Sequence, residues 1–226
     1  MLKKICMVIF VIAVVMSVSL CIYKYYNYGT FFAKKIKIDE NNWKTVLINN
    51  EHYLDKEYKP ECVKLSNGEK VSKRIHPHLQ LMFDDARRQG ISITVGSGYR
   101  SWEEQNDLWE KEMNRLNEEG ISRHEAIAQG KLMVQRPGMS EHQTGLAVDI
   151  NSIQRDAPIL YKWLSDNSYK YGFILRYPEE KKKITGIIYE PWHFRYVGKE
   201  AAAIMKREDL CLEEYVKLYS YKLCLF

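Results

Sequence analysis

The strongest restriction on this chain comes from an uncharged apolar run near its beginning. Between Ile5 and Tyr23 the sequence holds nineteen residues without a charge, and Lys3 and Lys4 precede them. A helix needs about 20 apolar residues to cross roughly 30 Å of hydrocarbon. The run therefore predicts a transmembrane helix within residues 1–24. It would make the protein a single-pass protein of the cell membrane whose remaining chain lies outside the cytoplasm.

Two other interpretations of this segment also send the chain out of the cytoplasm. A cleaved signal peptide would use the two lysines, the apolar stretch and a weak small-residue site at Ser17-Val18-Ser19. The apolar run is longer than the roughly 7–15 residues of a typical signal-peptide core, which favours an uncleaved anchor. Lipidation at Cys21 is disfavoured because the bulky Leu20 stands where a small residue is wanted.

The net charge of +5 is concentrated at one end of the chain. Residues 1–38 contain six lysines and no acidic residue, which leaves 28 basic against 29 acidic residues in the rest. Lysines beside an apolar helix suit the anionic head groups of a lipid bilayer, although they could equally be solvated flanks. The remaining sequence has no basic excess of the kind that indicates nucleic-acid binding. No pattern in it indicates an obligate protein partner.

The five cysteines do not form a recognisable framework. Cys6 and Cys21 lie in the apolar run, whereas Cys62, Cys211 and Cys224 are far apart. No C-x-x-C pair is present, which excludes a zinc knuckle or a redox pair. One disulfide among the last three cysteines remains open.

The rest of the chain reads as a linker over residues 25–42 and one domain over residues 43–226. Gly90 ends one predicted helix, and Ser101 with Glu104 forms a capping box that begins the next. Ser122 with Glu125 repeats this pattern. Helices are expected over 76–89, from 102 onward, after 122, over 158–168 and from 199 onward. Strands are expected over 44–49, 91–95, 146–150, 172–176, 184–189 and 192–197. This order indicates an α+β fold with helices packed against a mostly antiparallel sheet.

Two short clusters of polar residues stand out at strand edges. In the first, Asp149 lies between Val148 and Ile150, whose apolar side chains indicate a strand interior. A carboxylate at such a position is costly unless it is paired or bound to a metal. On a straight strand His142 and Asp149 would face opposite ways, but Gly145 permits a bend that brings them together.

The second cluster is Glu190-Pro191-Trp192-His193-Phe194-Arg195-Tyr196. Pro191 cannot belong to a central ladder, so the chain must be irregular there and Glu190 can approach His193. Two histidines and one aspartate make a three-ligand zinc site with an open position for water, beside which an unligated glutamate is the usual base. The residues alone also allow a purely structural alternative, in which Asp149 forms a salt bridge and the two histidines are core residues. The other histidines, His52, His76, His78 and His124, are interpreted as surface residues.

Three segments together resemble the signature of the VanY-type D-alanyl-D-alanine carboxypeptidases. They are Ser97-Gly98-Tyr99-Arg100-Ser101 with Gln105, the unbroken run from Ser140 to Asp149, and the run from Glu190 to Gly198. The similarity extends from about Leu47 to Val216. It implies the small α+β metallopeptidase fold shared with the D-Ala-D-Ala dipeptidases. It also implies one zinc ion per chain on His142, Asp149 and His193, with Glu190 as base, Arg100 steadying the oxyanion, and Gln105 and Ser140 holding the end of the substrate.

The resemblance implies a hydrolase that removes a terminal D-alanine from peptidoglycan stem peptides. A close alternative is an L,D-carboxypeptidase that trims tetrapeptide stems with the same motifs. A lysis-type endopeptidase fits less well with an anchored chain. A non-catalytic wall-binding domain is disfavoured because Glu190 and all three ligand residues are present. From the residues alone, Gln105 has a structural alternative, since it shares a helical stripe with Trp102 and Trp109.

Overall fold

A four-stranded antiparallel sheet forms the centre of the domain, with strand order β5-β6-β8-β7. Its strands are β5 (Thr94–Ser97), β6 (Ala147–Asn151), β7 (Phe173–Leu175) and β8 (His193–Tyr196). Two small sheets accompany it: β1 (Lys34–Lys35) runs parallel to β2 (His52–Tyr53), and β3 (Cys62–Lys64) runs antiparallel to β4 (Lys70–Ser72). The mostly antiparallel α+β fold expected from the sequence is confirmed.

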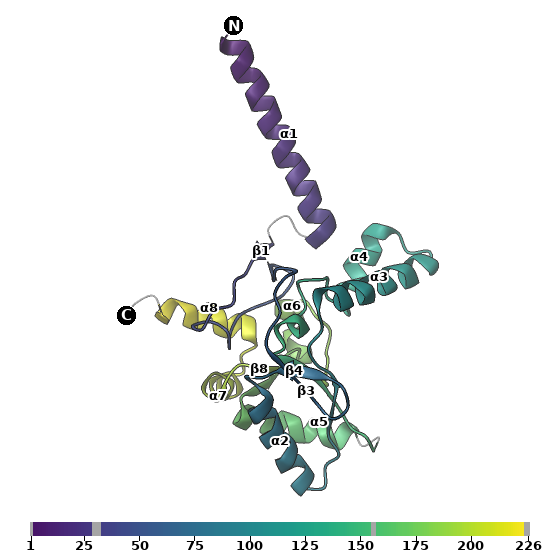
Figure 1. The fold of residues 1–226 in the computed structure, drawn as a ribbon, viewed down its shortest axis with the longest axis vertical. Helices are drawn as coiled ribbons and strands as arrows, with labels where there is room; N and C mark the ends of the chain where they lie inside the picture. Colours follow the sequence, from purple (N-terminus) through teal and green to yellow (C-terminus); the bar gives the residue numbers. More distant parts are fainter. Residues whose placement is uncertain (1, 29–32, 155–156, 224–226) are drawn as a thin grey trace.

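The computed structural model describes residues 2–28, 33–154 and 157–223, with side chains omitted at 2–4, 22–28 and 220–223. The helices are α1 (Leu2–Tyr28), α2 (His76–Arg88), α3 (Trp102–Glu118), α4 (Arg123–Gly130), α5 (Ala157–Asn167), α6 (Lys182–Thr185), α7 (Lys199–Glu208) and α8 (Leu212–Leu223). Short 3-10 turns are η1 (Glu141–Thr144), η2 (Ser168–Tyr171) and η3 (Glu179–Lys181). In Figure 1, α3 and α4 extend as a pair on one side of the domain and α7 and α8 lie on the other.

The two faces of the central sheet differ sharply in chemistry. Along β6, Val148 and Ile150 are fully buried in the main hydrophobic cluster, together with Phe194 of β8. Successive side chains of a strand point to opposite faces, so Asp149 and His193 leave the sheet on the other side. One face therefore packs against the apolar side chains of α2 and α5, and the other carries carboxylate, imidazole and guanidinium groups.

Helix boundaries followed the sequence signals closely. The Ser101 side chain accepts a hydrogen bond from Glu104 N, and the reciprocal bond of the capping box is also present. Ser122 accepts in the same way from Glu125 N at the start of α4. These caps satisfy amide groups that would otherwise lack partners in the first turn of each helix. The tail expected to be helical from residue 199 forms α7 and α8, with Asp209 in a left-handed conformation between them.

The strands expected over 44–49 and 184–189 are wrong. Val46 and Ile48 are buried, but apart from a bridge at Asn49 their segment pairs with no strand in the described structure. The second segment begins inside α6, which Gly186 ends in a left-handed turn. Apolar residues report burial as much as strand pairing, which explains the first error, whereas the β-branched Ile184 is an exposed residue of α6. The β3–β4 hairpin lies in a stretch for which the sequence predicted no strand.

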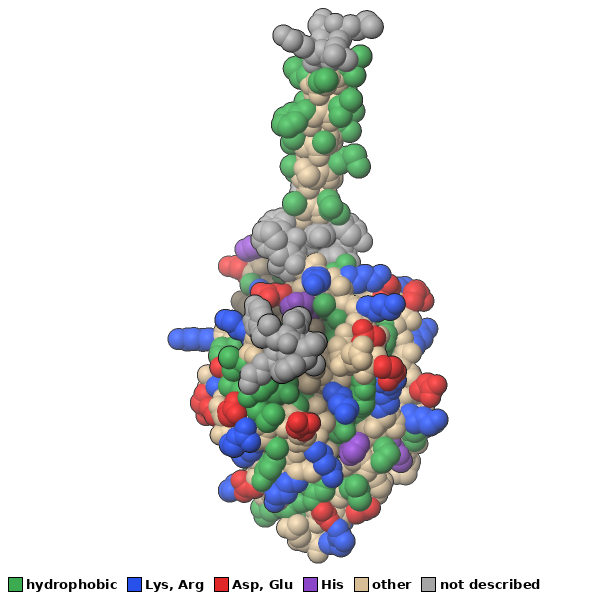
Figure 2. Space-filling model, turned by 90° about the vertical axis from the view of Figure 1, so that its left-hand side faces the viewer, with side chains coloured by type: hydrophobic (Ala, Val, Ile, Leu, Met, Phe, Trp, Pro, Cys, Tyr) green, Lys and Arg blue, Asp and Glu red, His purple; other side chains and the backbone are tan. Residues whose placement is uncertain are grey.

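Most of the described side chains of α1 are apolar, and all of them are exposed. Phe10 is 70% exposed and Met16 is 67% exposed, and green side chains cover the helix along its described length in Figure 2. Among the residues whose side chains are described, no helix has both the length and the apolarity of a membrane span. Beyond α1, Ala33 is buried and β1 pairs with β2, so part of the predicted linker over 25–42 lies against the domain.

The described cysteines carry free thiols. These are Cys6, Cys21, Cys62 and Cys211. Cys224 lies outside the described residues, so a disulfide that involves it stays a prediction.

Candidate metal centre

Asp149 and His193 are brought together by the register of the central sheet. They are directly paired residues of the antiparallel strands β6 and β8. His193 Nδ1 lies 3.2 Å from Asp149 Oδ1, and His142 Nε2 lies 3.5 Å from Asp149 Oδ2. One ligand atom from each of the three residues lies within 4.8 Å of the others, and within the described chain no other group of this kind was found. The predicted ligands therefore meet in space.

A turn before β6 delivers His142 to this cluster. His142 belongs to η1, whose first amide groups are capped by Ser140, and the turn ends at Gly145 with a φ of 69°. A Cβ atom at Gly145 would lie 3.1 Å from the backbone nitrogen of Ser72, so both the conformation and the space favour glycine. The bend predicted at this glycine is confirmed.

Hydrogen bonding indicates which nitrogen of each histidine is available to a metal. His142 Nδ1 lies 2.7 Å from the carbonyl oxygen of Gly98, which can only accept, so Nδ1 carries the proton and Nε2 is free. His193 instead directs Nδ1 at Asp149. Gly98 approaches so closely that a Cβ atom there would lie 2.1 Å from the carbonyl oxygen of Lys70.

The donor set fits a zinc ion. Two imidazole nitrogens and one carboxylate are usual zinc ligands, and three protein ligands leave a position open for water or substrate. Asp149 Oδ1 is buried and accepts no hydrogen bond, and His193 Nδ1 lies 3.2 Å from it. A cation bound by both atoms would give this buried oxygen a partner. Burial disfavours the charged Asp149, but His142 and His193 outweigh it and hold the pKa of the carboxyl well below its usual range.

Glu190 lies beside the three ligand residues without belonging to a strand. Its Oε2 is 3.4 Å from His193 Nδ1, and its backbone N–H donates to the carbonyl of Tyr177 at 3.2 Å. Burial, with a contribution from the Asp149 carboxylate, raises the pKa of Glu190 to about 7. A metal cation nearby would counteract this shift. The irregular chain predicted at Pro191 is confirmed, since β8 begins only at His193.

Arg100 is held in place by two neutral side chains. Its Nη1 donates to Gln105 Oε1 at 2.7 Å, and its Nη2 donates to Ser97 Oγ at 2.9 Å. The amide nitrogen of Gln105 donates to the carbonyl of Gln135. Burial lowers the pKa of Arg100, against the effect of Asp149 and other acids. Both ends of the Gln105 amide are thus engaged within the protein, and its predicted contact with substrate stays a prediction.

These residues line a cavity of about 190 Å³. Ser140, His142, Asp149, Glu190 and His193 contribute its polar surface. Its apolar lining includes Leu108, Met133, Ile187 and Trp192. A larger cavity of about 390 Å³ lies beside β7 and α7, and its lining includes none of the predicted site residues. The smaller cavity therefore contains the side chains that could carry out catalysis.

Two neighbours of the cluster were not singled out from the sequence. The buried ring of Tyr177 lies 4.9 Å from the His193 ring, and Glu141 lies beneath the same histidine. The only sequence signal for Glu141 is its position between Ser140 and His142, two of the predicted site residues. The remaining histidines stay outside the cluster, but the surface interpretation holds fully for His124 alone, because His52, His76 and His78 are half-buried.

Comparison with known proteins assigns the chain to one family. The family model described as VanY, D-alanyl-D-alanine carboxypeptidase, matches residues 68–199. A D-alanyl-D-alanine carboxypeptidase of Enterococcus faecalis is 43% identical over 190 residues, which cover 83% of this chain and 71% of that protein.

Two solved structures share the fold. VanYB in complex with D-alanine-D-alanine is 43% identical with a TM-score of 0.75, and the match covers 78% of this chain and 99% of that one. The vancomycin resistance D,D-pentapeptidase VanY from a VanB-type cassette, in complex with Zn(II), is 44% identical with a TM-score of 0.72. That match covers 77% of this chain and 99% of the other.

Replacing a ligand residue is expected to abolish zinc binding. His142→Ala, Asp149→Ala or His193→Ala each removes one of three protein ligands, whereas His124→Ala changes an exposed histidine outside the cluster. The full-length protein and the His124→Ala control should carry about one zinc ion per chain by elemental analysis, and the three ligand variants far less. A ligand variant that retained full zinc occupancy would show that its residue is not a ligand.

Proposed function

Because the chain belongs to the VanY family of D-alanyl-D-alanine carboxypeptidases, we propose that His142, Asp149 and His193 hold the zinc ion with which it removes the terminal D-alanine of peptidoglycan stem peptides. The observation that supports this assignment most strongly is the meeting of the three ligand atoms within 4.8 Å of one another. They line a cavity that also contains Glu190 and Arg100. The chain is a zinc-dependent hydrolase, and the roles of the single residues are our proposal.

When bound, zinc would supply a Lewis acid that lowers the pKa of a water molecule and polarises the scissile carbonyl. Glu190 accepts the proton of the attacking water and donates it to the amine of the departing D-alanine. Its position 3.4 Å from His193 Nδ1 places the carboxylate beside the ligands. A carboxylate that lines this cavity can accept a proton and release it again during the reaction.

Arg100 lines the same cavity and donates hydrogen bonds to the substrate. A guanidinium has five N–H donors, and the protein engages Nη1 through Gln105 and Nη2 through Ser97. The remaining donors can bind the carbonyl oxygen as negative charge develops on it, or the terminal carboxylate of the substrate. Ser140 borders the same cavity and is proposed to help hold that terminus.

Glu190→Gln is expected to separate catalysis from metal binding. The amide keeps the size of the side chain but cannot accept the proton, so turnover should fall by about 10²- to 10⁴-fold. Zinc content should stay at the wild-type level because Glu190 is not among the three ligand residues. The exposed Glu180→Gln provides a matched control that should retain full activity. Near-normal turnover of Glu190→Gln would assign the base to another group.

Specificity for a free terminus can be tested by amidating the terminal carboxylate of a pentapeptide stem. Loss of a charge-assisted hydrogen bond should cost roughly 2 kcal/mol or more in kcat/KM. The same pair of substrates is measured with Arg100→Lys, because a lysine cannot reproduce the fork of the guanidinium. If Arg100 binds the terminal carboxylate, the losses in kcat/KM caused by amidation and by Arg100→Lys are less than additive. If it binds the oxyanion, the two losses add.

The product analysis of that assay also distinguishes the related activities. Release of free D-alanine from the pentapeptide, faster than from the tetrapeptide, is the expected result. A preference for the tetrapeptide would indicate an L,D-carboxypeptidase with the same metal centre. Efficient cleavage of amidated or internally extended stems would contradict an exopeptidase.

We further propose that α1 anchors the enzyme in the cell membrane with the catalytic domain on the extracytoplasmic side. The support is the uncharged run of the sequence, which extends to Tyr23, beyond the side chains that are described. A helix with apolar residues on every side suits lipid better than water, and the described side chains of α1 are exposed. Lys24 and the lysines from Lys34 to Lys37 would then lie near the lipid head groups.

Cell fractionation tests the anchor. The full-length protein should sediment with membranes, retain its original N-terminus and be degraded by protease added outside wall-stripped cells. Replacing Val11 and Val15 in the run by arginine should release the protein from the membrane fraction. A soluble mature form that begins near Leu20 would show a cleaved signal peptide instead.

A further inference from the structure

Beneath the metal centre lies a cluster of four charged side chains, Glu141, Arg176, Arg195 and Glu213. Arg176 and Arg195 are 0% exposed and are the two largest fully buried side chains of the described structure. Glu141 Oε1 accepts from Arg176 Nε at 2.9 Å and from Arg195 Nη1 at 2.7 Å. Arg176 also donates both of its terminal nitrogens to Glu213, at 2.9 and 2.7 Å. The two positive and two negative charges thus balance inside the domain.

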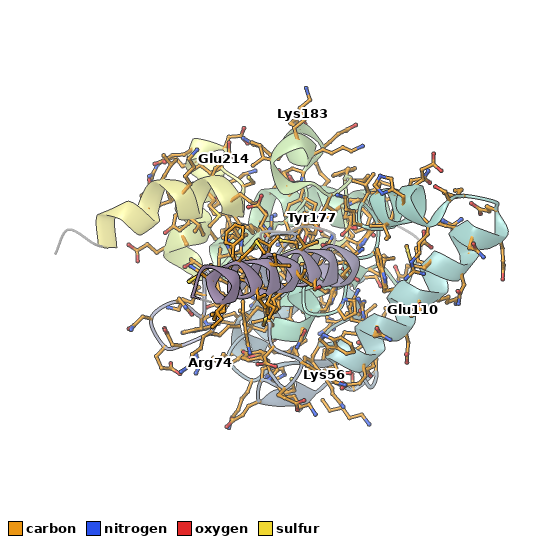
Figure 3. The ribbon with its side chains drawn as sticks, turned by 90° about the horizontal axis from the view of Figure 1, so that it is seen from above. Lys56, Arg74, Glu110, Tyr177, Lys183 and Glu214 are labelled. Carbon is orange, nitrogen blue, oxygen red and sulfur yellow. The ribbon has the colours of Figure 1, made fainter. Side chains whose placement is uncertain are left out.

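This cluster reaches from the sheet to the C-terminal helix. Glu213 lies on α8, and Arg176 follows directly after β7. Figure 3 labels their sequence neighbours, with Tyr177 near the middle of the view and Glu214 on the yellow C-terminal helices. The bidentate pair of Arg176 with Glu213 therefore ties α8 to the centre of the domain.

The second oxygen of Glu141 has no partner within the described structure. Glu141 Oε2 is buried and accepts no hydrogen bond, and His193 Nε2 is buried and also without one. The two atoms face each other at 4.0 Å. Since His193 directs Nδ1 at Asp149, a neutral ring that offers the Nδ1 lone pair to a metal must carry its proton on Nε2. A buried donor and a buried acceptor thus lie opposite each other, separated by slightly more than a hydrogen bond.

We propose that Glu141 is a positioning residue whose Oε2 accepts a hydrogen bond from His193 Nε2–H and so keeps His193 Nδ1 unprotonated for the metal. The inference rests on the proposed zinc centre and deepens it. Arg176 and Arg195 both donate to Oε1 of Glu141, which leaves only Oε2 available to the imidazole.

The two histidines thereby have different outer partners. His142 is oriented by the neutral carbonyl of Gly98, whereas His193 is oriented by a full negative charge. A carboxylate partner makes an imidazole a stronger ligand than a carbonyl does, because it stabilises the partial positive charge that the ring gains on metal binding. Removing the Glu141 charge should accordingly weaken zinc binding without removing a ligand.

The experiment compares Glu141→Gln with Glu213→Gln in the full-length protein purified in detergent. In Glu141→Gln the amide oxygen is needed by the two arginines, so the NH₂ group faces His193 Nε2 and favours the tautomer with the proton on Nδ1. Glu213→Gln removes the same charge from the other side of Arg176 and does not contact His193. Zinc affinity is measured by competition with a chromophoric chelator, and the stability of both zinc-free variants by denaturant unfolding.

Glu141→Gln should lose more stability than Glu213→Gln, because it removes a carboxylate from both Arg176 and Arg195, whereas Glu213→Gln removes one from Arg176 alone. Only Glu141→Gln should bind zinc about 10- to 100-fold more weakly, with Glu213→Gln within about 3-fold of the wild type. Equal zinc affinity of the two variants would overturn the inference and leave the proposed function standing. A wild-type protein that binds no zinc would overturn both.

A measurement on the wild-type protein does not depend on the variants' folding. In the zinc-loaded protein labelled with ¹⁵N-histidine, the spectrum should show His193 protonated on Nε2, with a proton that exchanges slowly with water. A rapidly exchanging Nε2 proton, or zinc bound through Nε2 of His193, would contradict the role of Glu141.

Discussion

In the central sheet, Asp149 of β6 lies directly opposite His193 of β8, and the metal centre depends on this register. Val148, Ile150 and Phe194 fill the apolar core on the opposite face. A shift of one residue would exchange the two faces of a strand and turn a carboxylate into the core, where an unpaired charge is very costly. Hydrophobic packing on one side of the sheet thus sets the geometry of the ligands on the other.

The charged side of the sheet is also largely buried, although the Asp149 side chain keeps 19% of its surface exposed to the cavity. Buried ion pairs seldom add net stability, since the loss of hydration offsets their attraction. The position of Glu141 beside His193, a proposed metal ligand, accounts for the cluster in another way. Arg176 and Arg195 hold Glu141 through Oε1, so that Oε2 is free for His193, whereas the Gly98 carbonyl bonds directly to His142. Ligand side chains held by such partners need little rearrangement when a metal binds.

Much of this arrangement could be predicted from local sequence patterns, and the errors have a common cause. The caps at Ser101 and Ser122 were recognisable because their partners lie three residues away. The strands expected over 44–49 and 184–189 were wrong because, apart from the bridge at Asn49, neither segment pairs with a strand of the described structure: Val46 is buried without pairing, and Ile184 is an exposed residue of α6. Local patterns report which residues are hidden from water, and they do not report the partner against which each residue packs.

The sequence by itself determined the chemical parts of the site: a carboxylate among apolar strand residues at Asp149, a bend at Gly145 and an irregular segment at Pro191. Each follows from the conformational limits or burial cost of the residue itself. Only the tertiary structure decided how these parts are oriented, because the deciding contacts join distant segments. Glu141 and Arg195, 54 positions apart, meet at 2.7 Å beneath His193, and long-range pairing of this kind depends on the packing of the whole sheet rather than on any short stretch of chain.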